Sequence, residues 1–105
     1  MSKIARYAKT LAKPGQGDEL ATRLLEAADG LRGDPGCELY LVNRQHGEPD
    51  AIWVTELWRS QADLDAATER IRGSREVAQT IALAERWEMI ELEFLGGKQG
   101  GSDDD

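Results

Sequence analysis

Residues 37–60 read CELYLVNRQHGEPDAIWVTELWRS, and this stretch decides the fold. It holds two segments rich in Leu, Val and Trp, at 37–44 and 51–59, joined by a polar loop with one Gly and one Pro. This pattern predicts an antiparallel β-hairpin. An antiparallel sheet with one wet face alternates apolar and polar residues, yet residues 39–42 and 52–54 are apolar without a break. We therefore expect both faces of the hairpin to be covered.

The sequence before the hairpin predicts a strand and then a helix. Residues 4–12 have a strand pattern, and residues 13–17, which contain Pro and two Gly, end it. Asp18 is placed to cap the following helix, which we expect to end near Gly33. The apolar positions of this helix fall on one stripe: Leu20, Leu24, Leu25, Ala28 and Leu31. One face of the helix is therefore available to cover a sheet.

The sequence after the hairpin predicts two short helical segments and a last strand. Ser60 begins the first segment, and Asp63 completes a capping box three residues later. Gly73 interrupts the helix, Ser74 caps a second segment, and residues 87–95 form the strand. The residues expected on the buried sides of the two segments are Leu64, Ala66, Ala67, Ile71, Val77, Ala78, Ile81 and Ala84.

Together these elements predict an α+β fold of ferredoxin-like βαββαβ order, with an antiparallel sheet and the helices on one face. We expect residues 1–95 to form a single domain and residues 96–105, rich in Gly and Asp, to form a flexible tail.

Helices on one face leave the other apolar face of the sheet bare. An exposed patch of several hundred Å² is large for a monomer. At ~25 cal/mol per Å², hiding ~500 Å² on each chain is worth ~12 kcal/mol per monomer before the costs of association. We therefore expect a homodimer that packs sheet against sheet about a two-fold axis.

The composition excludes several classes of partner. The 105 residues carry a net charge of −7, which argues against binding nucleic acid through its phosphates and against docking on an anionic membrane. There is no apolar run of membrane-spanning length and no secretory signal, so we expect a cytoplasmic protein. Cys37 is the only cysteine, which rules out a disulfide within the chain and a C-x-x-C site.

Several strings in this chain resemble the antibiotic biosynthesis monooxygenase domain family, which includes the quinol monooxygenases. The resemblance covers residues 4–98, and its most specific parts are the "PGC-x-x-Y" and "E-x-W" strings in this order. The matching segments are Lys13–Gly15, Asp34–Tyr40, Trp53–Trp58, Arg59–Ala66 and Gly96–Lys98. The resemblance implies a dimeric α+β barrel with a pocket between sheet and helices in each subunit. It also implies cofactor-free oxygenation of phenols, hydroquinones and anthrones.

The chain departs from the family pattern in places. Many members carry a His in the helix after the E-x-W strand, where this chain has Ala67. A minority of the family degrades haem with an Asn on the first strand, a Trp on the second helix and that His. Residues 4–10 contain no Asn, and residues 60–85 contain neither Trp nor His, so we do not expect haem degradation.

Glu56 and Trp58 are the best candidates for chemistry. They lie two apart on one strand and therefore face the same side. Glu56 can accept a phenolic proton as a catalytic base, or can instead accept hydrogen bonds from backbone groups of a neighbouring loop. Trp58 can line an aromatic pocket or can be core. No cofactor or metal motif is present, so the substrate itself has to donate electrons to O₂.

Three further residues are candidates for the substrate pocket: Tyr40, Tyr7 and Arg86. The tyrosines can place hydroxyl groups there or can serve packing, and Arg86 can stabilise an oxyanion or pair with a surface Glu. His46, the single histidine, is expected to be exposed in a loop.

Three functions fit this sequence. The first is a cofactor-independent monooxygenase of a small electron-rich aromatic. The second is a protein that binds a small hydrophobic ligand without turnover, and the third is a cofactor-free isomerase or cyclase of a polyketide-like ring. The second and third gain weight because the helix His is missing.

Overall fold

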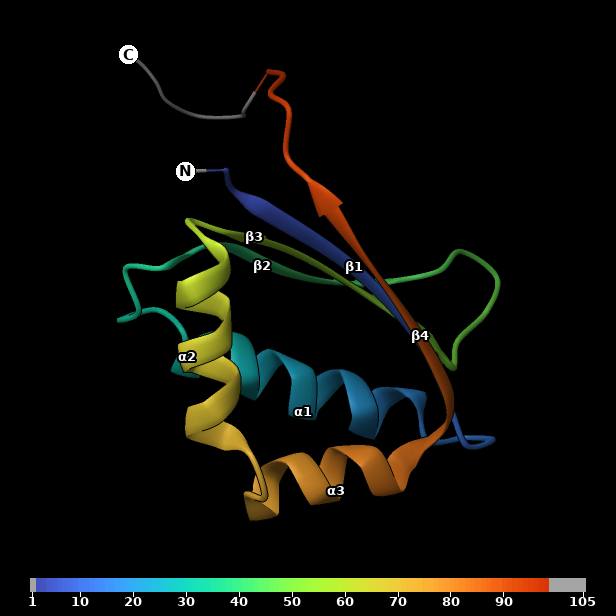
Figure 1. Ribbon diagram of the computed structural model, residues 1–105. Helices are drawn as coiled ribbons and strands as arrows, with labels where there is room; N and C mark the ends of the chain where they lie inside the picture. The colour runs from blue at the N-terminus through green and yellow to red at the C-terminus, as the bar shows by residue number, and fades with distance from the viewer. Residues whose placement is uncertain (1, 99–105) are drawn as a thin grey trace.

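The computed structural model describes residues 2–98, which form a four-stranded antiparallel sheet with three helices. The strand order is β2-β3-β1-β4, and all three helices lie on the same side of the sheet (Figure 1). This confirms the predicted ferredoxin-like α+β fold. The elements in chain order are β1 (Ile4–Ala12), α1 (Gly17–Gly30), β2 (Cys37–Arg44), β3 (Ala51–Trp58), α2 (Gln61–Ile71), α3 (Arg75–Leu83) and β4 (Ala84–Glu93).

Two apolar clusters hold the helices against the sheet. In the first, Leu20 of α1 packs against Ile52 of β3, and both side chains are fully buried. In the second, Trp58 at the end of β3 packs against Leu64 and Ala67 of α2. Because side chains alternate along a strand, the even-numbered residues of β3 all face the helices. The core therefore lies over β3, with α1 and α2 as its cover.

Helix α1 starts differently from the prediction. The predicted cap, Asp18, lies in the first turn, and Gln16 at the cap position makes no side-chain cap bond. The carboxylate of Asp50 instead accepts the backbone N–H of Gly15 at 3.1 Å and of Gly17 at 2.9 Å. A Cβ at position 17 would collide with the carbonyl oxygen of Pro49, so only glycine fits this approach. The helix ends at Gly30, before the predicted end near Gly33.

The caps of the later helices are as predicted. The Oγ of Ser60 accepts the backbone N–H of Asp63 at 3.2 Å, and the Oγ of Ser74 accepts that of Val77 at 3.1 Å. Leu25 of the predicted apolar stripe on α1 is exposed, and so are four of the residues predicted to be buried on α2 and α3. These four are Ala66, Ile71, Ala78 and Ile81.

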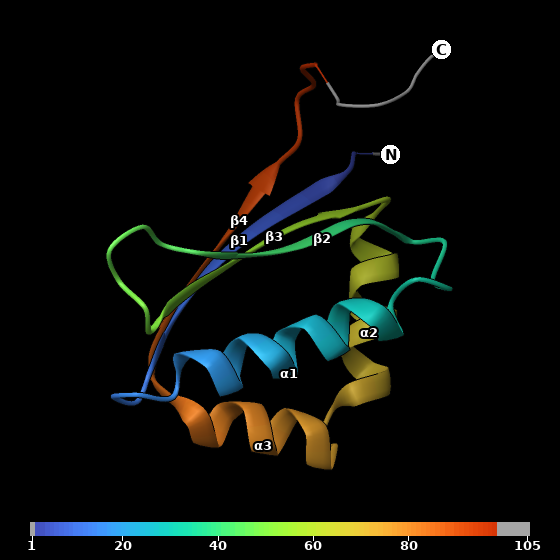
Figure 2. The same ribbon diagram turned by 180° about the vertical axis from the view of Figure 1, so that it is seen from behind.

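The position of α3 explains the exposed residues on that helix. Figure 2 shows α3 beside α1 and farther from the sheet than α1 is. Because α3 reaches the sheet only near its end, where Leu83 packs against the first cluster, its apolar stripe stays half covered.

Strand β4 is longer at its start than predicted. It begins at Ala84, directly where α3 ends, and pairs with β1 from Ala12 onward. It ends at Glu93, before the predicted end at Leu95. Residues 96–98 of the predicted tail have no regular structure, and residues 99–105 lie outside the described part of the chain.

The face of the sheet turned away from the helices is apolar and uncovered in this chain. We call it the outer face. Large apolar side chains exposed on it are Tyr7, Leu39, Leu41, Trp53, Ile90 and Leu92. Both faces of the sheet are thus apolar, as the sequence of the hairpin indicated. Within residues 2–98, every helix is too short or too polar to cross a membrane.

Candidate functional site

A row of polar residues crosses the helix-facing side of the sheet. In the strand register Tyr40 lies opposite Glu56, Glu56 opposite Arg6, and Arg6 opposite Glu91. We call these four residues the polar row. The next row along the same side is apolar and consists of Val42, Val54, Ala8 and Met89. Each of the four strands therefore contributes one residue to the polar row, which crosses an otherwise apolar surface.

Glu56 sits in the middle of the polar row and is 5% exposed. The indole Nε1 of Trp58 donates to its Oε1 at 2.7 Å. The Nη2 of Arg6 lies 3.3 Å from both carboxylate oxygens and donates to Oε2. A buried carboxylate needs such partners to offset its loss of water. The partners are two side chains, and not the loop backbone that the structural alternative named.

Arg6 lies between two carboxylates. Its Nη1 is 3.8 Å from the Oε2 of Glu91, and its Nε is buried with no hydrogen-bond partner among residues 2–98. The side chains become more exposed toward the edge of the sheet, from Glu56 through Arg6 at 20% to Glu91 at 47%. From Glu56 to Glu91, the polar row therefore runs from a buried centre to a solvent-exposed edge at β4.

Tyr40 is the fourth member of the row. Burial of its hydroxyl, and then the nearby charge of Glu56, raise the pKa of Tyr40 to about 12. The phenol is therefore neutral at physiological pH and keeps its proton as a hydrogen-bond donor.

The structure brings together only some of the residues predicted for the pocket. Trp58 and Tyr40 lie with Glu56 on the helix-facing side. Tyr7 and Arg86 lie on the outer face, because Tyr7 alternates with Arg6 and Arg86 pairs with Leu11. The sheet therefore separates these two residues from Glu56, and a single pocket in one chain does not contain all five.

The helix-facing side of β4 is left open by the helices. Trp87 and Met89 on this side are 57% and 42% exposed, and Glu91 follows them on the same face. We call these three residues the β4 strip. It offers an apolar surface for a flat ring, ending in the carboxylate of Glu91 beside Arg6. Arg6 and Glu91 were not predicted from the sequence, since their pairing depends on the register of β1 against β4.

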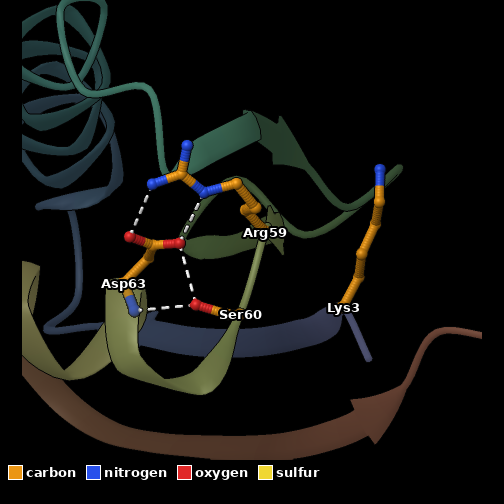
Figure 3. Close-up of a pocket in the computed structure, with 4 residues that line it drawn as sticks. All are labelled: Lys3, Arg59, Ser60 and Asp63. Atoms are coloured by element: carbon orange, nitrogen blue, oxygen red, sulfur yellow. Dashed lines mark hydrogen bonds and ion pairs between the residues drawn. The ribbon is translucent and has the colours of Figure 1, made fainter. Parts of the chain in front are cut away.

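A polar hollow of about 510 Å³ lies at the end of the sheet, lined by Lys3, Arg59, Ser60 and Asp63 (Figure 3). Arg59 donates to both oxygens of Asp63, at 2.8 and 2.9 Å, and Ser60 donates to one of them. These bonds lower the pKa of Asp63 to about 2. Lys3 is paired with Glu38 at 2.6 Å. All the charged groups that line the hollow are therefore already paired, and none of the lining residues belongs to the polar row.

Other reactive groups stand apart from the polar row. Cys37 is half-buried, and burial raises the pKa of its thiol, which makes it a poor nucleophile at neutral pH. His46 is exposed in the loop between β2 and β3, as predicted. Residues 2–98 contain no group of three His, Cys, Asp or Glu side chains that could hold a metal ion.

Comparisons with known proteins identify relatives of the whole domain. The sequence profile of the antibiotic biosynthesis monooxygenase family matches residues 4–83. A crystal structure of a protein from Chloroflexus aurantiacus J-10-fl with the same family description is 33% identical. It has a TM-score of 0.80 and covers 95% of this chain and 100% of its own. A comparison with curated proteins gives no match.

More distant structures share the fold. A Mycobacterium tuberculosis protein is 21% identical, with a TM-score of 0.81 over 93% of this chain and 100% of its own. A Deinococcus radiodurans protein is 17% identical, with a TM-score of 0.76 over 96% of this chain and 99% of its own. At these identities the likeness concerns the arrangement of strands and helices.

Proposed function

Because this chain belongs to the antibiotic biosynthesis monooxygenase family, we propose that it oxidises a small electron-rich aromatic molecule with O₂, without a cofactor. The substrate is of the hydroquinone, phenol or anthrone type. The observation that carries the proposal is the β4 strip, where exposed Trp87 and Met89 adjoin the charged pair of Arg6 and Glu91. A flat ring with a hydroxyl group matches an apolar surface that ends in a carboxylate and a guanidinium.

Oxygenation without a cofactor places the electron demand on the substrate. O₂ reacts slowly with closed-shell molecules, and a deprotonated phenol or anthrone is a far better electron donor than its neutral form. In an anthrone, the ring methylene loses both hydrogens and becomes a carbonyl. One oxygen atom of O₂ becomes the carbonyl oxygen, and the other leaves as water with the two hydrogens. The protein then has two tasks, which are to hold the ring away from bulk water and to favour its anion.

The polar row supplies the groups for the second task. Glu56 is the buried anchor of the proposed site, since it holds Arg6 and Trp58 through its two oxygens. Arg6 places positive charge beside the β4 strip, where it stabilises a substrate oxyanion. Tyr40, opposite Glu56 in the strand register, keeps its proton at neutral pH and is therefore available as a hydrogen-bond donor at this site.

We further propose that two copies of the chain pack through their outer faces. The outer face carries six large exposed apolar side chains, more than a small monomer usually leaves in water. Covering this face would also bring Tyr7 and Arg86 into the assembly, although on the far side of the sheet from Glu56.

Sedimentation of matched variants tests the dimer. We expect the wild type to sediment at twice its 11.6 kDa chain mass at micromolar concentration. Leu41→Asp on the outer face should give a folded monomer, and Leu25→Asp on α1 should stay dimeric. Leu41 and Leu25 are 49% and 56% exposed, so the two variants differ in the surface that they change and not in how exposed the changed residue is. A wild type that sediments as a well-folded single chain contradicts the proposal.

Oxygen uptake tests the reaction. With menadiol or anthrone under air, we expect uptake above the autoxidation rate. Uptake should fall at least tenfold in Met89→Glu, because a charge on the β4 strip repels an apolar ring. Leu25→Glu places the same charge on α1 and should leave the rate unchanged. A wild type that matches the blank across a panel of such substrates excludes the oxygenase.

Binding without turnover is the second candidate. It is favoured by one observation: Glu56 is 5% exposed and both of its oxygens already accept hydrogen bonds from the protein, so a substrate hydroxyl has little access to this carboxylate. Native mass spectrometry that finds a small apolar molecule carried through purification, with no oxygen uptake, supports this function. A ring isomerase or cyclase would convert its substrate under nitrogen as fast as under air.

A further inference from the structure

Arg6 and Glu91 are the two members of the polar row that face each other without a direct hydrogen bond among the described residues. The Nη1 of Arg6 and the Oε2 of Glu91 are 3.8 Å apart, which is beyond the range of a direct hydrogen bond. An oxygen atom bridging this gap has to accept a hydrogen bond from Arg6 and donate one to Glu91. A phenolic hydroxyl does both.

Glu56 and Glu91 share Arg6 but differ in their access to a ligand. Glu56 is 5% exposed, and both of its oxygens already accept hydrogen bonds from the protein. The side chain of Glu91 is 47% exposed, and within residues 2–98 its one charged contact is the 3.8 Å approach of Arg6. A general base must come within hydrogen-bond reach of the proton that it removes, and the exposed Glu91 is better placed for this than the buried Glu56.

We infer that Glu91 is the catalytic base, and that Arg6 and Glu91 together bind the hydroxyl of a phenolic substrate; this rests on the proposed function. The O–H bond of the substrate breaks, and its proton forms a new O–H bond with the Glu91 carboxylate. The electron pair stays on the substrate oxygen, next to Arg6. The aromatic ring lies on Met89 and Trp87, which precede Glu91 on the same face of β4.

The transfer keeps the charge balance of the cluster. Before the transfer Arg6 faces two carboxylates, Glu56 and Glu91. After it, Arg6 faces Glu56 and the phenolate, while Glu91 is neutral. The total charge is unchanged, so the anion replaces Glu91 as the second partner of Arg6. Because Glu91 lies at the wet edge of the sheet, it can return its proton to water after each turnover.

Binding of two matched probes tests the inference without any turnover. We would titrate 4-nitrophenol and its methyl ether, 4-nitroanisole, at a pH where the free phenol is neutral. The ether has the same ring but cannot donate to Glu91. We expect Glu91→Gln to weaken 4-nitrophenol about tenfold, as for the loss of a hydrogen bond to a charged group, and to leave 4-nitroanisole unchanged.

Glu93→Gln is the matched control, because Glu93 lies two residues further on the same face of β4 and is exposed. It should change the affinity of neither probe. Thermal unfolding of both variants checks that the fold is kept. Equal affinity of the wild type and Glu91→Gln for 4-nitrophenol overturns the inference, as does a wild type that binds neither probe.

Turnover separates this inference from the proposed function. With menadiol, Glu91→Gln should lower kcat about a hundredfold, and Glu93→Gln should not. If the wild type consumes oxygen and Glu91→Gln does so at the same rate, the oxygenase stands and the role of Glu91 is wrong. If no variant consumes oxygen but Glu91 still discriminates phenol from ether, the oxygenase fails and the hydroxyl site stands.

Discussion

The two faces of the sheet differ in an unusual way: a charged residue lies on the buried face, and large apolar residues lie on the exposed face. The helix-facing side of β3 is buried, yet it carries the carboxylate of Glu56 between Ile52 and Trp58. The outer face is open, yet it carries Trp53 and, on β2, Leu41. A charge in a core demands partners, and a bare apolar face demands cover. The open edge of the first face is where we propose a ligand site, and the second face is where we propose that two chains pair.

The largest effect expected from this comparison is the loss of Arg6. Arg6→Met leaves the buried Glu56 without its cation and should lower the free energy of unfolding by about 3 kcal/mol. Lys9→Met changes a cation on the outer face, 5.6 Å from the ring of Trp53, and should cost under about 1 kcal/mol. Urea unfolding measures both.

The double variant Arg6→Met with Glu56→Leu controls for the lost charge. It removes the unpaired carboxylate and should regain a large part of the stability. Equal costs for Arg6→Met and Lys9→Met would mean that the two faces do not differ as described.

Truncation of one isoleucine on each face of the sheet compares how much the two faces contribute to stability. Ile52→Ala opens a cavity in the buried cluster and should cost about 2–4 kcal/mol. Ile90→Ala on the outer face should cost under about 1 kcal/mol in a dilute monomer. If the outer faces pair, the cost of Ile90→Ala will grow with protein concentration, which thermal unfolding at several concentrations measures. A cost that stays constant argues against pairing through this residue.

Alkaline pH probes the dry centre of the polar row. The pKa of Tyr40 is raised to about 12, so the unfolded chain loses this proton near pH 10 while the native chain keeps it. Stability should therefore fall by up to about 2 kcal/mol between about pH 10 and about pH 12. Tyr40→Phe should remove this part of the decline. Chemical unfolding across this range, with Tyr7→Phe as the control, decides the point, and identical slopes in all three proteins would refute it.

Acid probes the rim of the sheet, where the smallest effect is expected. Arg59 and Ser60 lower the pKa of Asp63 to about 2. Its stabilising contribution is therefore present above about pH 4 and is lost as the pH falls toward about 2. Asp63→Asn should be less stable than the wild type at neutral pH and should converge with it in acid. A difference that persists at about pH 2 would point to lost capping of α2 and not to charge.

The sequence predicted the fold well because its local signals agree with the tertiary structure. The bounds of β1 and β2, and the caps Ser60 and Ser74, depend only on neighbouring residues and were correct. The start of β4 was missed, because Glu85 and Arg86 are polar and α3 passes into the strand without a loop.

The candidate site was predicted in part. Glu56 and Trp58 share a face by simple alternation along one strand, which a sequence reveals. Arg6 and Glu91 join them only through the register of β1 against β3 and β4, which a single sequence does not contain. One signal was available in the sequence. Arg6 shares one face of β1 with Ile4 and Ala8, so a cation on this face would point toward the core and would need an acidic partner there.

The contact between Asp50 and the start of α1 bears on how the chain is made. Helices α2 and α3 carry their own serine caps, whereas the first turn of α1 borrows its acceptor from a residue 33 positions later. During synthesis, the residues of α1 are translated before Asp50, which caps the helix. The first turn of α1 is capped only once the loop after β2 has brought Asp50 to it. The capping of the first helix in the chain therefore depends on a later step of folding.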